Sequence, residues 1–108
     1  MDFNLFVIAG TIAADPEHRS FDSGASLIRY LVTTRSTEPR RRIDVLPITL
    51  WNPGDDVPTL THGDGIWVVG SAQRRFWDTG DGRRSRLELV ARHVELRNPD
   101  ISEETGTG

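Results

Sequence analysis

Hydrophobic and polar residues alternate along several segments of this chain, and this alternation predicts β-strands rather than helices. The first segment, residues 4–14, is rich in β-branched and aromatic side chains. Gly10 interrupts it where a strand would bend sharply or admit a neighbouring backbone. Residues 15–17 and 21–24 carry turn signals, so residues 18–21 form at most a short strand between two turns.

Two longer segments, residues 26–35 and 43–52, separate an apolar face from a mixed face. The positions that we expect inside are Ile28, Tyr30 and Val32 in the first segment and Leu46, Ile48 and Leu50 in the second, in phase with Asp44. The positions on the other face are Arg29, Leu31, Thr33 and Arg35, then Val45, Pro47, Thr49 and Trp51. This phase puts Trp51 on an open face at the end of its strand, where a ligand could use it.

The rest of the chain predicts a connector and then a long hairpin. Proline and glycine at four positions of residues 52–64 leave room for only a very short helix. From residue 65 onward Ile66 and Val68 share one face, and the opposite face carries Trp67, Val69, Ser71, Gln73, Arg75 and Trp77. On the return arm Leu87, Leu89 and Ala91 are in one phase, and Val94 and Leu96 are in the other. A bulge or break near residues 92–93 would reconcile the two phases.

Five or so strands, two long basic hairpins and little helix indicate an all-β fold. A chain of 108 residues closes one core, so we expect one domain over residues 1–97 and a short disordered tail over 98–108. Strands of this length and number favour a five-stranded Greek-key barrel of the oligonucleotide/oligosaccharide-binding type, the OB-fold. In that fold a ligand lies across the second and third strands and between the flanking loops.

Composition narrows the functional classes. The chain has no cysteine and three separated histidines, so we expect no metal site and no cofactor. The net charge of −3 includes three tail carboxylates (Asp100, Glu103 and Glu104), without which 13 arginines face 13 carboxylates. The apolar run over residues 5–14 is too short to cross a membrane and follows no basic leader. We therefore expect a cytoplasmic, nucleoid-associated protein with no membrane partner.

The arginines are concentrated beside aromatic residues. Five of the 13 lie within residues 70–89 and three more are Arg40, Arg41 and Arg42. Bases stack on aromatic rings and guanidinium groups pair with phosphates, so this combination points to single-stranded nucleic acid. The predicted DNA-binding residues are Arg29, Arg35, Arg40, Arg41, Arg42, Trp51, Arg74, Arg75, Phe76, Trp77, Arg83, Arg84 and Arg86.

Simpler interpretations exist for both hairpins. The long hairpin could be solvated, with its tryptophan packed back on the barrel, and the arginine run could be a solvated loop or a localisation-type patch. Catalysis has little support, because residues 78–82 lack the spacing of a calcium loop and residues 63–65 begin no phosphate-binding or dinucleotide motif. Asp55 and Asp56 are adjacent in a Gly/Pro loop with no sign of a shared site. We expect a protein that is not an enzyme.

From about residue 4 to residue 96 the chain resembles the bacterial single-stranded DNA-binding proteins. Residues 4–19, which include Asp-Pro-Glu, are similar to the first strand and turn of that family, and Arg-Arg-Phe-Trp-Asp at 74–78 is similar to its Arg/Lys-Trp hairpin. Residues 24–34, 63–70 and 84–96 resemble the second strand, the lead into the fourth and the closing strand.

The resemblance implies a preference for unpaired DNA, little sequence choice and assembly as a homotetramer, with a dimer as the alternative. It makes Trp77 the stacking residue of the hairpin, gives Trp51 the place of an aromatic at the end of the third strand, and puts Trp67 where a subunit contact is common. The chain also departs from the family, with Val45 in place of a tryptophan. Its last eight residues, 101–108, do not reproduce the acidic tail with a hydrophobic tip, which puts tail-mediated recruitment of proteins in doubt.

Two functions therefore compete. The first is sequence-tolerant binding of single-stranded DNA in replication, recombination or repair. The second is an OB-fold oligomerisation or protein-interaction module with weak or no DNA binding, in which the aromatic residues are interface anchors. RNA remains a third possible ligand, because stacking surfaces accept either sugar.

Overall fold

The computed structural model describes residues 1–97 and contains only strands and loops over that range. Six strands are present: β1 (Phe6–Ile12), β2 (Glu17–Ser20), β3 (Ser26–Ser36), β4 (Arg42–Trp51), β5 (Gly65–Thr79) and β6 (Gly82–Arg97). The predicted tail, residues 98–108, lies outside the described residues. In the described part of the chain no helix is long and apolar enough to cross a membrane.

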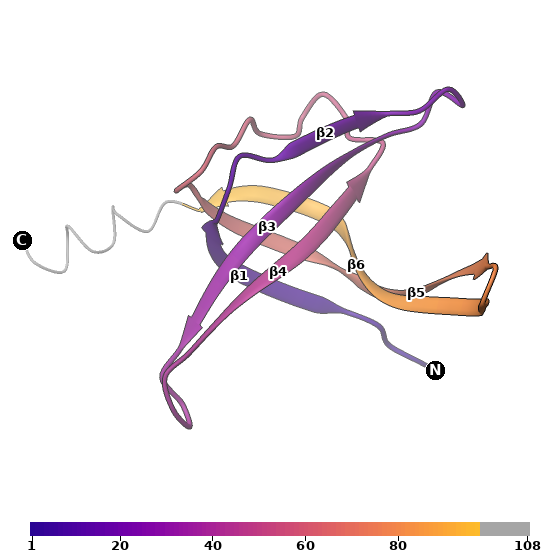
Figure 1. Ribbon diagram of the computed structural model, residues 1–108. Helices are drawn as coiled ribbons and strands as arrows, with labels where there is room; N and C mark the ends of the chain where they lie inside the picture. The colour runs from indigo at the N-terminus through magenta and orange to yellow at the C-terminus, as the bar shows by residue number, and fades with distance from the viewer. Residues whose placement is uncertain (98–108) are drawn as a thin grey trace, which may run out of the picture.

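Five of the strands close into a barrel, as the alternation predicted (Figure 1). Around the barrel the order is β1-β5-β6-β4-β3, and β3 returns to β1 through Thr11↔Thr33 and Ile12↔Val32. Most pairs are antiparallel, but β4 and β6 run parallel at Ile48↔Leu89 and Thr49↔Val90. The short β2 adds to the free edge of β3. The predicted OB-type barrel is confirmed.

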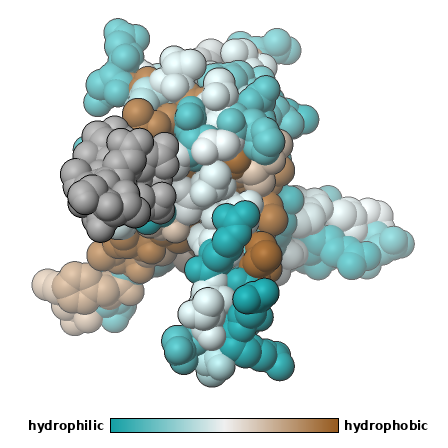
Figure 2. Space-filling model, turned by 90° about the vertical axis from the view of Figure 1, so that its left-hand side faces the viewer, coloured by the Kyte–Doolittle hydropathy of each residue, from teal (hydrophilic) through white to brown (hydrophobic). Residues whose placement is uncertain are grey.

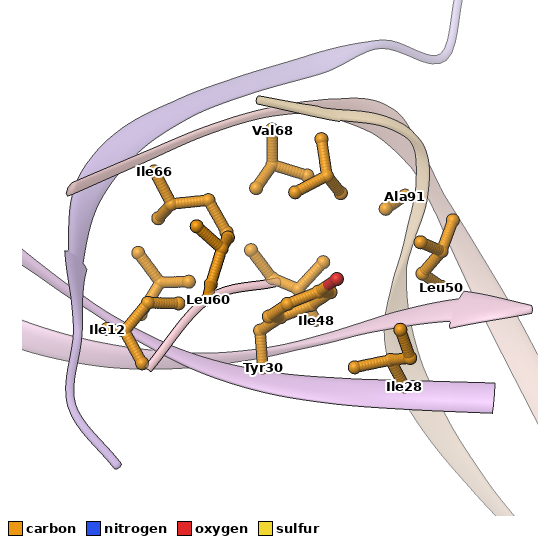
Figure 3. Packing of buried hydrophobic residues seen from close by; sticks show 11 residues of the cluster. Ile12, Ile28, Tyr30, Ile48, Leu50, Leu60, Ile66, Val68 and Ala91 are labelled. Atoms are coloured by element: carbon orange, nitrogen blue, oxygen red, sulfur yellow. The ribbon is translucent and has the colours of Figure 1, made fainter. Parts of the chain in front are cut away.

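The barrel interior holds most of the side chains that the period-2 pattern assigned to it (Figure 3), but Leu46 is only half-buried and lies outside the core cluster. Tyr30, Val32, Ile48, Ile66 and Val68 are each at most 1% exposed. Leu60 joins this core from the connector between β4 and β5, which contains no helix. Sequence periodicity did not indicate Leu60, because it lies in a segment of prolines and glycines without alternation.

Gly10 admits a neighbouring backbone, which was one of the two roles expected of it. β1 pairs with β5 along Phe6–Thr11 and with β3 at Thr11 and Ile12, so it bridges two parts of the sheet. A Cβ atom at Gly10 would collide with the carbonyl oxygen of Thr33. Only glycine permits this approach between β1 and β3.

The predicted bulge is present in β6. Val69 pairs with His93 and Gly70 pairs with Ala91, which leaves Arg92 as the extra residue. This insertion shifts the phase of β6, so Ala91 and Val94 both face the core. Gly70 allows the bulge to form, because a Cβ there would collide with the carbonyl oxygen of Val90.

Two hairpins extend beyond the barrel and project in different directions (Figure 1). The β5–β6 hairpin stays paired to Thr79↔Gly82, and Gly82 has a φ of 123°, which favours glycine. The β3–β4 hairpin stays paired to Ser36↔Arg42. Arg42, predicted as a loop residue, is therefore the first residue of β4. The two basic segments do not meet, which corrects the expectation that both would flank one groove.

Candidate nucleic-acid interface

Trp51 is the centre of a cluster on the outer face of the barrel. Its indole N–H donates a hydrogen bond to Glu88 Oε1 at 3.3 Å. The guanidinium carbon of Arg75 lies 5.6 Å from the centroid of the Trp51 ring, and Arg75 Nη1 is 3.4 Å from Glu88 Oε2. Phe21 stacks on the same indole at 6.0 Å between centroids and 29° between planes. The structure thus confirms Trp51 outside the core, half-buried by these neighbours.

The strand register explains why Trp51 is held outside. Leu27 lies directly opposite Trp51 in the β3–β4 ladder, and directly opposite residues share a face of the sheet. Leu27 is 3% exposed yet does not belong to the barrel core. The outer face at this end of β3 and β4 is therefore partly covered. Neither Leu27 nor Phe21 is among the predicted site residues, because Phe21 lies in a predicted turn and Leu27, in the outer phase of residues 26–35, carries neither a ring nor a charge.

Two adjoining hollows open beside this cluster. The first, of about 180 Å³, is lined by Trp51, Gln73, Arg74, Arg75 and Glu88. The second, of about 80 Å³, is lined by Arg29, Pro47, Thr49, Arg86, Leu87 and Glu88. Both share Glu88, whose side chain is only 10% exposed. The outer face of β3, β4 and β6 therefore offers apolar and cationic groups around one nearly buried carboxylate.

The β5–β6 hairpin extends this surface with one of its two faces. The outward phase of the hairpin carries Arg75 and Trp77, and their partners in the ladder are Arg86 and Arg84. Because cross-strand partners share a face, these four side chains continue the face that carries Trp51. Trp77 is 43% exposed, so it is not packed into the interior of the barrel.

The other face of the hairpin carries the remaining predicted residues. Phe76 is opposite Ser85, Arg74 is opposite Leu87, and the guanidinium of Arg83 lies 4.5 Å from the centroid of the Phe76 ring. This side of the hairpin is opposite to the side that carries Trp77, although Arg74 also lines the hollow beside Trp51. The hairpin thus presents one aromatic ring with neighbouring arginines on each side.

The arginines of the β3–β4 hairpin are far from Trp51. Arg42 and Trp51 are at opposite ends of β4, roughly 30 Å apart at the rise of an extended strand. Arg40 and Arg41 lie in the loop, Arg35 is exposed on the outer phase of β3, and Arg42 forms a 3.0 Å salt bridge with Asp44. The predicted set therefore divides into a proximal group beside Trp51 and a distal group at this hairpin.

Trp67 is in a third location. It pairs with Ala9 of β1 and Glu95 of β6, is 43% exposed, and has the guanidinium carbon of Arg97 5.6 Å from its ring centroid. It lines neither hollow beside Trp51. Val7, two residues before Ala9 on β1, is also exposed. Figure 2 shows hydrophobic atoms gathered toward the lower left of one face, next to the hydrophilic β3–β4 hairpin at the bottom.

The chemistry of the site is that of binding surfaces. Within residues 1–97 no group of three or more His, Asp or Glu side chains could hold a metal ion. In the barrel core, burial raises the pKa of Tyr30 above its ordinary value of 10.0. The outer face instead offers aromatic rings and guanidinium groups, which suit planar, anionic ligands.

Comparison with known proteins agrees with this chemistry. A family model described as the single-strand binding protein family matches residues 3–97. The chain belongs to the single-strand binding protein family. The resemblance inferred from the sequence is therefore confirmed, and the OB-type barrel of this family member carries its apolar and cationic surface on β3, β4 and the β5–β6 hairpin.

Two curated relatives are similar to this single-strand binding family member. They are the single-stranded DNA-binding protein 1 of Staphylococcus aureus strain COL and the single-stranded DNA-binding protein 2 of S. aureus strain MSSA476. Each is 26% identical over 110 residues, an alignment that covers 95% of this chain and 66% of the relative. The chain thus spans just under two thirds of the length of these relatives.

Proposed function

We propose that this chain binds single-stranded DNA with little sequence preference, by stacking bases on aromatic rings and pairing phosphates with arginines. The observation that carries the proposal is the shared outer face on which Trp51, Arg75 and Trp77 lie in one continuous phase. Arg29 and Arg86 line the adjoining hollow. Family membership and the names of the relatives support the same ligand.

Stacking and charge would contribute separately. Stacking supplies about 1 to 3 kcal/mol per base and accepts any base, because every base has a π-face. Each arginine–phosphate contact makes log K fall with log salt by a slope of roughly 0.7 for single strands. Duplex DNA keeps its bases stacked inside the helix and therefore cannot use the aromatic rings. In the cell, this binding would protect exposed strands at the nucleoid during replication, recombination or repair.

A fluorescence titration tests the proposal directly. The three tryptophans of the chain report on binding, and oligo-dT is compared with a duplex of equal length at two salt concentrations. We expect quenching by oligo-dT that weakens as salt rises, and a smaller response to the duplex. Absence of quenching at low salt would contradict the proposal. An oligo-U arm shows whether RNA is bound equally well.

We also propose that the chain assembles with itself, as a tetramer or a dimer. The supporting observation is exposed apolar surface away from Trp51: Val7 is 58% exposed and Trp67 43%. A monomer would leave these side chains in water, whereas a second copy could bury them. Light scattering at several protein concentrations measures the assembly, and a strict monomer at every concentration would contradict it.

The competing function, an interaction module without DNA binding, would instead use Trp51 and Trp77 as anchors of a protein interface. It predicts that the chain assembles and that oligo-dT does not quench its tryptophan fluorescence. Replacing Trp77 or Trp51 by alanine separates the two functions. DNA binding requires a loss of affinity with the assembly intact, whereas the interaction module requires a change in assembly.

A further inference from the structure

Arg92 stands out among the arginines that the sequence did not assign to the site. It is the extra residue of the β6 bulge, it is exposed, and it has no salt bridge or side-chain hydrogen bond with any residue in 1–97. A bulge turns a side chain out of the regular ladder and is common beside functional sites. Arg92 can therefore bind an anion without first breaking an ion pair, whereas Arg75 and Arg42 are each paired with a carboxylate.

Arg92 and Trp51 lie close together where the parallel pairing of β4 and β6 ends. The last pair of that register is Thr49↔Val90, and each of the two residues lies two positions beyond it. Both side chains line a hollow of about 360 Å³, together with Pro53, Asp56 and His93 among others. This hollow shares Trp51 with the one that contains Arg75. The surface around Trp51 therefore continues toward the bulge.

A fourth hollow extends the same surface toward the N-terminal segment. It has a volume of about 520 Å³ and is lined by Arg92, Gln73, Ser71 and residues 2–5. The side chain of Asn4 holds that segment in place, because its amide donates to the carbonyl of Ala72 and its oxygen accepts from the Ala72 N–H. Arg92 is thus common to two hollows, each of which shares a residue with the hollow beside Arg75.

We propose that a bound single strand continues from Trp51 over the β5–β6 bulge, and that Arg92 pairs with one of its phosphates there. This inference rests on the proposed function. Asp56 and Asp2 line the two hollows and disfavour phosphate near them, and His93 is 3.1 Å from Glu95. The phosphate contact is therefore assigned to Arg92 itself, which extends the site beyond the predicted set.

The experiment compares oligo-dT of increasing length on the full chain and on Arg92→Ala. Short oligomers that fill only the groove beside Trp51 should bind both proteins equally. With longer oligomers Arg92→Ala should bind more weakly, and its slope of log K against log salt should be smaller by about 0.7. Arg92→Lys keeps a point charge and should restore most of that slope. Arg19→Ala is the matched control, because Arg19 pairs with Glu17 at 2.8 Å and lines none of these hollows.

A second measurement leaves every arginine in place. The chain has no cysteine, so Asp56→Cys introduces a single thiol into the hollow that contains Arg92. Long oligo-dT should slow the reaction of this thiol with a maleimide, whereas short oligo-dT should leave the rate unchanged.

The possible results separate this inference from the function on which it rests. The proposed path over the bulge would be overturned if Arg92→Ala and the unmodified chain had equal affinities and equal slopes of log K against log salt at every length. It would also be overturned if long oligo-dT did not protect the thiol of Asp56→Cys. Either result would leave the proposal of DNA binding intact. A change of oligomeric state in Arg92→Ala and in Arg92→Lys alike would assign Arg92 to a subunit interface, and would also overturn the path. Absence of binding by the unmodified chain would overturn the proposed function itself.

Discussion

The guanidinium of Arg75 lies over the indole ring of Trp51, with its central carbon 5.6 Å from the ring centroid. Both side chains also bond to one carboxylate, that of Glu88. This arrangement fixes the orientation of the indole and holds a cation beside it. It also puts a negative charge in the floor of a surface that we propose to bind a polyanion, so Glu88 both organises the site and opposes its ligand.

Glu88→Gln should therefore tighten binding of single-stranded DNA. Glutamine can still accept from the Trp51 indole, but it no longer neutralises Arg75 or repels phosphate. We expect a gain of roughly 1 kcal/mol, about fivefold in affinity. Titration with oligo-dT at low salt measures the gain, and thermal unfolding controls for altered stability. Weaker binding would show that the carboxylate matters mainly through the positions of Trp51 and Arg75.

Trp77→Ala should weaken DNA binding and leave the barrel intact. Trp77 projects on the hairpin with 43% of its surface exposed, so its removal leaves no cavity in the core. Loss of one stacking contact costs about 1 to 3 kcal/mol, or roughly 5- to 150-fold in affinity. Anisotropy of a labelled oligo-dT measures the loss without relying on tryptophan. Phe76→Ala changes the other face of the same hairpin, and a loss as large as that of Trp77→Ala would contradict the assignment of faces.

Arg86 and Arg42 should differ although both are arginines of the predicted set. Arg86 lines the hollow beside Glu88, whereas Arg42 pairs with Asp44 at 3.0 Å and lies in the inward phase of β4. We expect Arg86→Ala to lower the slope of log K against log salt by about 0.7, and Arg42→Ala to change this slope much less. The slopes are measured over a range of salt concentrations at fixed oligonucleotide length. Equal reductions would place a DNA contact at the distal hairpin as well.

Periodicity predicted the parts of this structure that depend on neighbouring residues in the sequence. Alternation assigned Ile28, Tyr30 and Val32 to the core and Trp51 to the open face, because side chains on a strand must alternate. A change of phase on the return arm located the bulge at Arg92. These features follow from the order of residues within single strands.

The composition of the site depends on contacts between distant segments, and the sequence did not reveal it. Glu88 lies 37 residues from Trp51 in the sequence. Nothing in the residues around Glu88 indicates that its carboxylate bonds to Trp51 and Arg75. Phe21 reached Trp51 from a turn, and Leu60 reached the core from a connector without alternation. The separation of the two basic hairpins also depends on strand twist and length. The number of arginines in each hairpin therefore did not show that the two hairpins lie apart.

Tyr30→Phe should stabilise the barrel and alter its behaviour at alkaline pH. The Tyr30 hydroxyl is buried and has no hydrogen-bond partner among the described residues (Figure 3). An unpaired buried polar group is costly, so its removal should raise the free energy of unfolding by about 1 kcal/mol.

The pH dependence of the same variant follows from the raised pKa of Tyr30. In the unfolded chain the phenol ionises near its ordinary pKa of about 10, whereas burial keeps it neutral in the fold. The contribution of the neutral Tyr30 phenol to the stability of the unmodified chain is therefore complete below about pH 10. It is lost as the pH rises from there through the folded pKa. Denaturant titrations at pH 7 and above pH 10 measure this. An equal alkaline loss in Tyr30→Phe would mean that another group is responsible.

Gly70→Ala should destabilise the barrel and disturb the bulge together. A Cβ at this position would collide with the carbonyl oxygen of Val90, approach the Cα of Ala91 to 2.9 Å and approach a ring carbon of Phe6 to 2.9 Å. Two of these atoms are backbone and cannot move without shifting β6, so we expect a loss of about 1 to 3 kcal/mol in the free energy of unfolding.

Gly80→Ala is the control for that variant, because an added Cβ at Gly80 meets nothing within 4 Å and should change stability by less than about 0.5 kcal/mol. Denaturant midpoints of both variants give the comparison. Since the bulge orients Arg92, Gly70→Ala should also reduce affinity for long oligo-dT more than for short. Equal midpoints for the two alanine variants would show that β6 shifts freely at this point, and the bulge would then be too soft to hold Arg92 in a fixed place.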